Sequence, residues 1–400
     1  MNERVVITGY DVMCSLGNNK EEVREGLQKQ EVPLTKYGKI ADIDEFENIY
    51  VGRAKWGNDR IGSYTDEDKS EKMLNKTFRG ALDDSGLNME SVDIVPERIS
   101  MSLATSIMGS EHTIEYKKTG DIRYVGLSKQ FGMRLARTFG IGGEIYTTSS
   151  ACASGSAAVG VAFDLIRSGR ADVVVCCGAD QISAISLYGF KTLGSMTNGK
   201  GKPFDKERDG INIGEGSACF IFESLSHARA RRANIRAEVL GFGLSNDAWH
   251  ITSPAPDGRG AIESMKMALK EGFGSLEKLD KWNIYVNAHG TSTKANDDME
   301  LKAIRHVFKN ADSNCMVNST KSLTGHCLGA AGSIELALGM IMGEEKIVYP
   351  TCNSNTDLDD DYNLNERITL EYNPEILLSN SFAFGGNDAS ILVRLNNIQT

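Results

Sequence analysis

The sequence predicts a mixed α/β fold assembled from two halves, with buried sheets and helices at the centre. Strand-like and helix-like segments alternate along the 400-residue chain, as they do where helices cover sheets. Two helix-like segments, 153–168 and 327–343, are so rich in glycine and alanine that they can pack closely, so we expect them to be central. The pattern starts again near residue 238, where we divide the chain into 1–238 and 239–400.

The first half opens with an apolar strand at 4–9. An amphipathic helix follows at 69–86, and we expect it to stop at Gly86 because glycine readily adopts the left-handed conformation that ends a helix. The remaining expected elements are strands at 97–105 and 143–151, a helix at 153–169, strands at 171–180 and 214–225, and a short basic helix at 226–234.

The second half repeats this alternation from a strand at 237–245. Its other expected elements are a helix at 258–272, a strand at 282–290, a helix at 296–309, a strand at 315–322, a helix at 327–345 and a closing strand pair at 376–395 around a glycine turn. Long apolar runs within these strands favour sheets that are buried on both faces.

Composition narrows the class of protein. The net charge of −10 argues against a nucleic-acid partner, and an acidic protein partner would need a local basic patch. The eight cysteines form no C-x-x-C pair, and the N-terminus lacks the apolar core of a signal peptide. The most apolar long segment, 325–343, contains His326 and Glu335 and is typical of a buried helix rather than a membrane span. We therefore expect a cytoplasmic protein with no membrane partner.

Cys152 is the first candidate for chemistry. It lies between an expected strand and an expected helix, in the sequence IYTTSSACASGSAA. A sulfur at a helix N-terminus is favoured as thiolate, and the small neighbouring residues leave room for a bulky substrate. An isolated cysteine can equally be a buried structural residue, and this segment alone does not decide between the two.

His289 and His326 occupy similar positions. Each follows a strand-like segment and precedes glycine-rich or hydroxyl-rich residues, and Lys321 stands five residues before His326. Either histidine alone could be a hydrogen-bonded core residue, but three reactive residues at such junctions favour a catalytic site. Zinc ligation by these residues is disfavoured because the spacings contain no close ligand pair. We find no metal, nucleotide or flavin signature, so no cofactor is expected.

Six sequence blocks together resemble a known family. SSACASG, VNAHGTST, KSLTGH-x-LGAAG and NSFAFGGND, in this order, look like the signature blocks of the elongating Cys-His-His β-ketoacyl-acyl carrier protein synthases. KPFDKERDG and GEGSACFIFE resemble two further blocks, and the similarity runs from Arg4 to about Leu395. The resemblance implies the thiolase-like fold, two similar halves in a five-layered αβαβα sandwich, normally as a dimer.

The resemblance also implies a reaction. Cys152 would accept an acyl chain from a carrier-protein thioester, and a malonyl-carrier would then lose CO2 and attack the acyl-cysteine. His289 and His326 would donate hydrogen bonds to the enolate oxygen that forms, whereas the backbone N–H groups of Cys152 and Phe384 would form the oxyanion hole of the acyl-enzyme. The site would take its substrates from an acyl carrier protein and would need no cofactor.

Further positions carry supporting roles by the same resemblance. Lys321 would hold a hydrogen-bond network together with Glu300, and Asp297 is placed similarly. Phe384 resembles the gating phenylalanine beside the cysteine, although it could also be an ordinary core aromatic. For carrier docking we expect a basic patch and single out Lys69, Lys72 and Lys202, each of which could equally be solvated surface.

Two departures from the family leave alternatives open. The chain has Asn387-Asp388 where Thr-Asn is usual, and the stretch between Met108 and Ile145 is shorter than usual. The second departure keeps open a heterodimer in a polyketide or polyene pathway, with a catalytically silent chain-length-factor subunit, in place of a homodimer. A non-enzymatic carrier-binding scaffold is a third hypothesis, which predicts that Cys152 is never acylated.

Overall fold

The computed structural model describes most of the chain. The described residues are 3–36, 46, 48–54, 68–89, 91, 95–121, 128–309, 315–354 and 372–398. No helix among them is long and apolar enough to cross a membrane.

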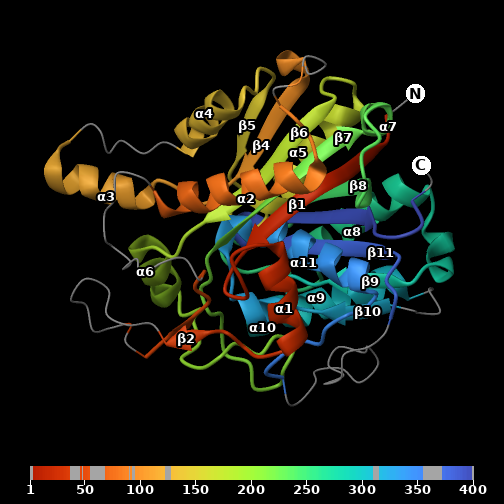
Figure 1. Ribbon diagram of the computed structural model, residues 1–400. Helices are drawn as coiled ribbons and strands as arrows, with labels where there is room; N and C mark the ends of the chain where they lie inside the picture. The colour runs from red at the N-terminus through yellow and green to blue at the C-terminus, as the bar shows by residue number, and fades with distance from the viewer. Residues whose placement is uncertain are drawn as a thin grey trace.

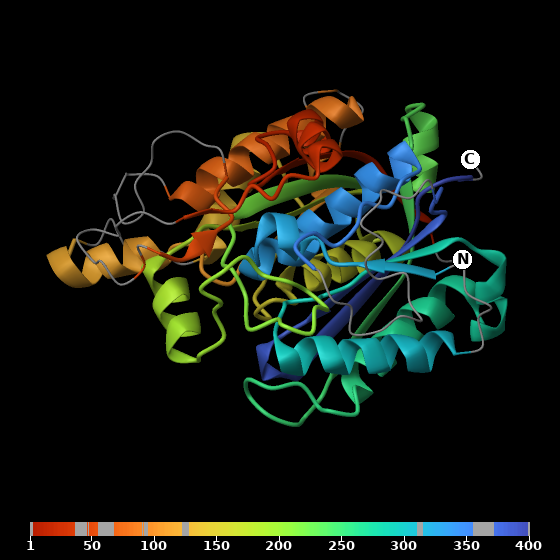
Figure 2. The same cartoon turned by 90° about the horizontal axis from the view of Figure 1, so that it is seen from below.

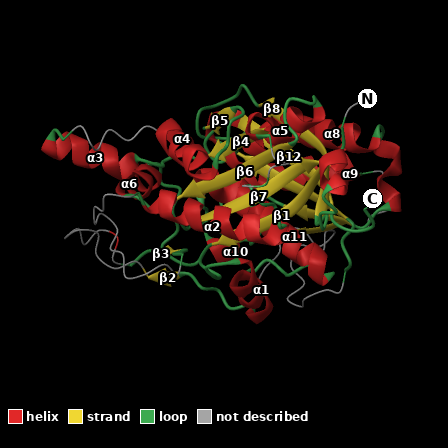
Figure 3. Ribbon diagram, turned by 45° about the horizontal axis from the view of Figure 1, so that its top comes forward, coloured by secondary structure: helices red, strands yellow, loops and turns green. Residues whose placement is uncertain are grey.

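One ten-stranded sheet organises the molecule, in the order β10-β9-β11-β12-β8-β1-β7-β6-β4-β5. Strands, drawn yellow, run through the centre of the molecule in Figure 3. The N-terminal part of the chain supplies β1 Val5–Met13, β4 Ile99–Ala104, β5 Ile145–Thr148, β6 Val173–Asp180 and β7 Gly216–Ser224. The C-terminal part supplies β8 Ala237–Asn246, β9 Ile284–Asn287, β10 Cys315–Asn318, β11 Ile376–Phe382 and β12 Asn387–Arg394. A separate two-stranded sheet pairs β2 Thr35–Lys36 with β3 Tyr50–Val51.

The two halves of the large sheet have the same topology. In the N-terminal half β5, β4 and β6 run parallel, and β7 and β1 continue antiparallel. In the C-terminal half β10, β9 and β11 run parallel, and β12 and β8 continue antiparallel. A short antiparallel pairing of β1 with β8 joins the halves. β8 begins one residue before the boundary that we placed at 238, and the division into domains there stays a prediction.

Helices form three layers around the sheet halves, as Figure 2 shows. Between the halves lie α5 Ser154–Arg167 and α11 Ala331–Glu345, which contact each other and strands of both halves (Figure 1). The outer helices on the N-terminal half include α2 Lys69–Ser85 and α4 Ser128–Phe139, and those on the C-terminal half include α8 Arg259–Phe273 and α9 Lys294–Phe308. The remaining helices are α1 Lys20–Lys29, α3 Ser110–Thr119, α6 Ala184–Thr192, α7 Leu225–Ala230 and α10 Lys321–Thr324.

Glycine explains why the central helices can meet. A Cβ added at Gly155 of α5 would lie 2.6 Å from the backbone nitrogen of Ser333 in α11, and one at Gly332 would lie 2.5 Å from Oγ of Ser156. Larger residues at either position would force the helices apart. The expectation that these two helices are central is therefore confirmed.

Most predicted elements are present with ends shifted by a few residues. The amphipathic helix α2 begins after an Asp68 cap and ends at Gly86 in the left-handed conformation. One prediction was wrong: the strand expected at 315–322 ends at Asn318, and Lys321 begins helix α10. The chain turns there because Oγ of Ser319 donates to the carbonyl oxygen of Gly290 at 2.7 Å.

Candidate active site

Cys152 lies in a tight turn between β5 and α5. Ala151, just before it, has a φ of 51°, a conformation that only few non-glycine residues adopt. Three hydrogen bonds hold this turn: Oγ of Ser154 and Oγ of Ser106 donate to the carbonyl oxygen of Ala151, and the N–H of Ser150 donates to Oγ of Ser154. The strained turn presents Cys152, which is 6% exposed, to the cavity described below.

The environment of Cys152 corrects one expectation. Burial raises the pKa of the Cys152 thiol to about 11, although the charge of Lys321 and the backbone N–H groups of Phe384 and of Cys152 itself lower it. The sequence predicted that a helix N-terminus would favour the thiolate. Helix α5 starts only at Ser154, and the loss of hydration outweighs the effects of the Lys321 charge and of the two backbone N–H groups. The sulfur is therefore a thiol in the free protein at neutral pH.

His289 and His326 face each other from two segments of the C-terminal half. His289 follows β9, and His326 follows α10; their ring centroids are 5.4 Å apart and the rings are nearly perpendicular. Nδ1 of His326 accepts from the N–H of Leu328 at 3.1 Å, and Nδ1 of His289 lies 3.3 Å from Nζ of Lys321, which can only donate. Both neutral rings consequently carry their proton on Nε2, where it is available as a donor.

The protonation of both histidines is set by burial and by one cation. Burial first, and then the charge of Lys321, lower the pKa of His326 to about 3. The same causes, together with His326, hold the pKa of His289 well below its ordinary value. Both rings are neutral at physiological pH, so they can donate hydrogen bonds but are not acids.

Lys321 connects these histidines to a carboxylate that the sequence analysis did not single out. Its Nζ, with the side chain 3% exposed, forms a short ion pair with Oε1 of Glu335, which projects from α11. Glu300, the acidic residue that the resemblance assigned to this network, instead accepts from the N–H groups of His289 at 2.8 Å and Gly290 at 2.7 Å. Burial raises the pKa of Glu300 to about 7.

Asp297 and Glu300 together fix the loop that carries His289. Oδ1 of Asp297 accepts from the N–H of Thr291 at 3.0 Å, and Oδ2 accepts from the N–H of Phe204 at 2.9 Å. Both carboxylates project from α9 and are fully buried. They therefore orient the backbone near His289 rather than face the cavity.

Phe384 begins the glycine turn between β11 and β12. Its ring stacks on Phe190 of α6 at a centroid distance of 5.6 Å, and Phe190 also lies 6.3 Å from the ring of His326. The backbone N–H of Phe384 reaches the Cys152 sulfur closely enough to lower its pKa. Gly385 and Gly386, with φ of 82° and 72°, allow the turn that aims this N–H.

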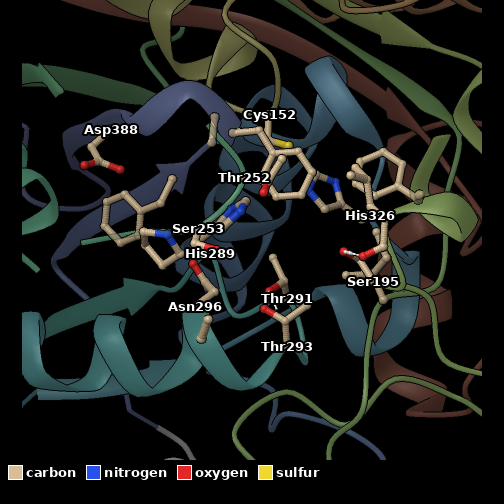
Figure 4. Close-up of a pocket in the computed structure, with 18 of the residues that line it drawn as sticks. Cys152, Ser195, Thr252, Ser253, His289, Thr291, Thr293, Asn296, His326 and Asp388 are labelled. Carbon is tan, nitrogen blue, oxygen red and sulfur yellow. Dashed lines mark hydrogen bonds between the residues drawn. The ribbon is translucent and has the colours of Figure 1, made fainter. Parts of the chain in front are cut away.

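These groups surround one cavity of about 230 Å³, shown in Figure 4. Cys152, His289, His326 and Phe384 line its inner part. Its other lining residues include a group of hydroxyl and amide side chains: Ser195, Thr252, Ser253, Thr291, Thr293 and Asn296. Within the described part of the chain, no three His, Cys, Asp or Glu side chains are arranged to hold a metal ion.

The three lysines proposed for carrier docking differ in their surroundings. Nζ of Lys69 pairs at 2.7 Å with Glu215, a fully buried carboxylate, so this cation has a structural partner. Lys72 is half-buried on the same helix, and Lys202 pairs at 3.3 Å with the exposed Glu207. None of the three is among the residues that line the cavity. Lys69 fits the docking role least, because moving it would leave Glu215 uncompensated.

Comparison with known families decides the class. The model of the β-ketoacyl synthase N-terminal domain matches residues 2–228, and that of the C-terminal domain matches residues 236–355. The chain belongs to the β-ketoacyl synthase family. Among curated relatives, the 3-oxoacyl-[acyl-carrier-protein] synthase 2 of Staphylococcus aureus (strain N315) is 32% identical over 98% of both chains. That of Rhizobium meliloti (strain 1021) is 41% identical, over 63% of this chain and 61% of the relative.

Solved structures agree with the assignment of this β-ketoacyl synthase to the thiolase-like fold. One is a type II PKS acyl-carrier protein in complex with its ketosynthase bound to the hexaketide, at a TM-score of 0.88 and 28% identity over 99% of this chain and all of that one. Another is the ishigamide ketosynthase/chain length factor, also at 0.88, with 29% identity and the same coverage. The predicted fold class is confirmed.

Two parts of this β-ketoacyl synthase site were missed at the sequence level. Glu335 could have been found, because it is the one carboxylate among residues 331–343 of the central helix, which are otherwise apolar or small, and such a residue needs a buried cation. Phe190 could not, because its contact with Phe384 joins two segments that are far apart in the sequence.

Proposed function

We propose that this protein is a β-ketoacyl-acyl carrier protein synthase that elongates an acyl chain by decarboxylative Claisen condensation. The observation that carries the proposal is the convergence of Cys152, two neutral histidines and the Phe384 N–H on one cavity. A nucleophilic sulfur and paired N–H donors are what acyl transfer followed by enolate formation requires. Membership of the family and the curated relatives, which are 3-oxoacyl-[acyl-carrier-protein] synthases, support the same reaction.

The first half-reaction transfers the acyl chain to sulfur. The thiol of Cys152 loses its proton as the sulfur attacks the thioester carbonyl, and the carrier thiol leaves. Negative charge on the carbonyl oxygen is stabilised by the N–H groups of Cys152 and Phe384, both close to the sulfur. The positive charge of Lys321 lowers the pKa of Cys152, which partly offsets the effect of burial and helps the sulfur to ionise.

The second half-reaction forms the carbon–carbon bond. The malonyl thioester loses CO2, and the electron pair of the broken bond passes into an enolate whose oxygen accepts from Nε2–H of His289 and of His326. The enolate carbon attacks the acyl-cysteine carbonyl, the Cys152 sulfur leaves as a thiolate that takes up a proton from water, and the β-ketoacyl product remains on the carrier. Neutral histidines suit this role, because the lowered pKa of each imidazolium leaves a neutral ring whose Nε2–H donates to the oxyanion without transferring its proton to it.

The partner subunit is a second part of the proposal. In the described structure β5 is an end strand of the large sheet, and Ile145 on it and Met133 on α4 are 38% and 44% exposed. An open edge with apolar side chains favours pairing with a like edge, in a homodimer or with a related ketosynthase-like subunit. Two of the similar structures contain a ketosynthase with a chain length factor, and these favour the heterodimer as an alternative. Mass measurement of the protein purified alone distinguishes the two.

We also propose a cytoplasmic location. All eight cysteines are free thiols, and seven of them are buried. Such a set is compatible with a reducing compartment.

The function is tested by supplying acyl-carrier and malonyl-carrier thioesters and measuring both CO2 release and the β-ketoacyl product. We expect both in equal amounts with the wild-type protein and no condensed product with Cys152→Ala. If the wild-type protein, tested alone and with candidate partner subunits, forms no product from acyl chains of any length, the scaffold hypothesis replaces the enzyme.

A further inference from the structure

Two carboxyl groups face each other on the wall of the cavity. Asp247 comes directly after β8, and Asp388 is the second residue of β12; they are 3% and 2% exposed and both line the cavity. Asp388 is labelled in Figure 4. Their oxygens converge beside Gly260, the second residue of α8. A Cβ added there would lie 2.0 Å from Oδ2 of Asp388 and 2.6 Å from Oδ1 of Asp247, so only glycine leaves room for the pair.

The hydrogen bonds of the pair lack one donor. Both carboxylate oxygens of Asp247 have a hydrogen-bond donor: Oδ2 accepts from the N–H of Ala255 at 2.9 Å, and Oδ1 accepts from the N–H of Gly260 at 3.3 Å. Oδ2 of Asp388 is buried without a donor from the described protein. Ionising both facing carboxyl groups is unfavourable, because their negative charges repel each other. A single proton between them removes this repulsion and supplies the missing hydrogen-bond donor.

The charges around the pair favour this proton. Burial first, and then the neighbouring Asp247 and the charge of Glu300, together raise the pKa of Asp388 to about 8. The facing groups are Glu300 of α9 and Arg259 at the start of α8. Arg259 does not neutralise the pair, because its guanidinium is held by the exposed Asp257.

The pair joins two segments that both line the site. Residues 247–253 and the turn 383–388 are linked by the Asp247 N–H to the carbonyl oxygen of Gly386 and by the Gly385 N–H to that of Ile251, both at 2.8 Å. The turn carries Phe384, whose N–H reaches the Cys152 sulfur. Asp247 and Asp388 are therefore connected, through the backbone of this turn, to the N–H donor that faces the Cys152 sulfur.

We propose that Asp247 and Asp388 share one proton and act as a positioning pair, which holds the Phe384 turn against residues 247–253 while the proton is present. Loss of the proton leaves two facing carboxylates, and their repulsion loosens the turn and misplaces the Phe384 N–H. The kinetic consequence rests on the proposed function; the movement of the loop does not.

The kinetic test compares the wild-type protein with Asp388→Asn, whose amide supplies a donor at every pH. From pH 6 to 9.5 we expect kcat of the wild-type protein to fall relative to the variant as pH passes about 8, by about tenfold per unit once the proton is lost. Asp83→Asn makes the same chemical change at an exposed position of α2, away from the pair, and should keep the wild-type profile. Superimposable profiles of wild type and Asp388→Asn would overturn the proposal, as would an Asp83→Asn profile that follows Asp388→Asn.

A second measurement does not require activity. Trp249, two residues after Asp247, is 57% exposed, so its fluorescence reports on the loop. We expect an emission change near pH 8 in the wild-type protein that is absent from Asp388→Asn, with Trp249→Phe as the blank. If Asp388→Asn shows the same fluorescence transition as the wild-type protein, the proposal that Asp247 and Asp388 share a proton would be wrong. Loss of condensation at every pH together with a normal fluorescence transition would count against the proposed function and leave the pair standing.

Discussion

The two halves of the molecule share a strand order but bring different chemistry to the site. In the N-terminal half β5 leads within six residues into α5, and the turn between them carries Cys152. At the equivalent place in the C-terminal half, β10 leads to α11 through a longer segment that contains α10 and His326. The short connection can hold only one reactive group, tightly and under backbone strain. The longer one has room for Lys321 and a histidine, which must be placed relative to each other.

Because of this difference, the nucleophilic sulfur and the groups that donate hydrogen bonds to the enolate come from different halves. The N-terminal half supplies a buried thiol whose pKa is raised to about 11. The C-terminal half supplies the cation Lys321 and two neutral N–H donors that respond to it. Neither half contains a complete site, so the reaction depends on the contact between them.

The largest effect is expected from the donors of the C-terminal half. His289→Ala or His326→Ala should slow malonyl decarboxylation by about 10²–10³-fold, the usual loss for one oxyanion donor. Acylation of Cys152 should persist, because its oxyanion donors are backbone N–H groups. The control is His306→Ala, which removes an exposed histidine from α9 and should change neither step. Normal decarboxylation by either variant would remove that histidine from the mechanism.

The next effect concerns the buried ion pair between Lys321 and Glu335. Lys321→Met should lower the free energy of unfolding by about 3–5 kcal/mol, because Glu335 is left as an unpaired buried charge. The double variant Lys321→Met/Glu335→Leu should regain much of that stability but not the activity, which needs the cation. Urea unfolding and condensation assays measure the two outcomes.

Lys202→Met is the matched control for this experiment, since its pair with Glu207 is exposed and should contribute less than about 1 kcal/mol. A double variant that recovers condensation as well as stability would show that Lys321 serves packing alone.

A smaller effect is expected in the pH dependence of Cys152 alkylation. Because the thiolate reacts and the pKa of Cys152 is raised to about 11, the rate should rise about tenfold per pH unit from 7 to 10 without levelling. Cys152→Ala corrects for the other thiols. A plateau near pH 8.5 would show that the N-terminal half activates the sulfur by itself, as the sequence suggested.

The smallest effect concerns carrier docking. Lys72→Glu with Lys202→Glu should raise the KM for acyl-carrier substrate a few-fold, and more at low salt, because surface charges mainly change association. A small acyl thioester without the carrier should react unchanged. Lys69→Glu should instead destabilise the fold, since it places a second carboxylate beside the buried Glu215. Equal losses with both substrates would exclude docking by Lys72 and Lys202.

The sequence was informative where function depends on a local pattern. Cys152 and His289 each stand just after a strand, His326 stands just after the short helix α10, and the turn at Phe384 is marked by its two glycines. The central helices could be predicted because only glycine and alanine permit their close contact. The Lys321–Glu335 ion pair could also have been predicted, because a charged side chain in an apolar, buried stretch of helix needs a partner of opposite charge.

The rest depends on contacts between distant segments. The Asp247–Asp388 pair joins residues that are far apart in the sequence, and no local pattern indicates it. The raised pKa of Cys152 has the same origin, because it comes from burial of the sulfur by residues of the assembled halves. Sequence position placed the sulfur near a helix start but could not show how little water reaches it.

The central claim is that Cys152 of the N-terminal half carries the acyl chain while the C-terminal half serves the enolate. Intact mass measurement after incubation with a panel of acyl-carrier thioesters tests it most directly. We predict that the wild-type protein and His326→Ala each gain the mass of one acyl group, and that Cys152→Ala gains none. A mass gain that persists in Cys152→Ala, or no gain in the wild-type protein with any chain length, would contradict it.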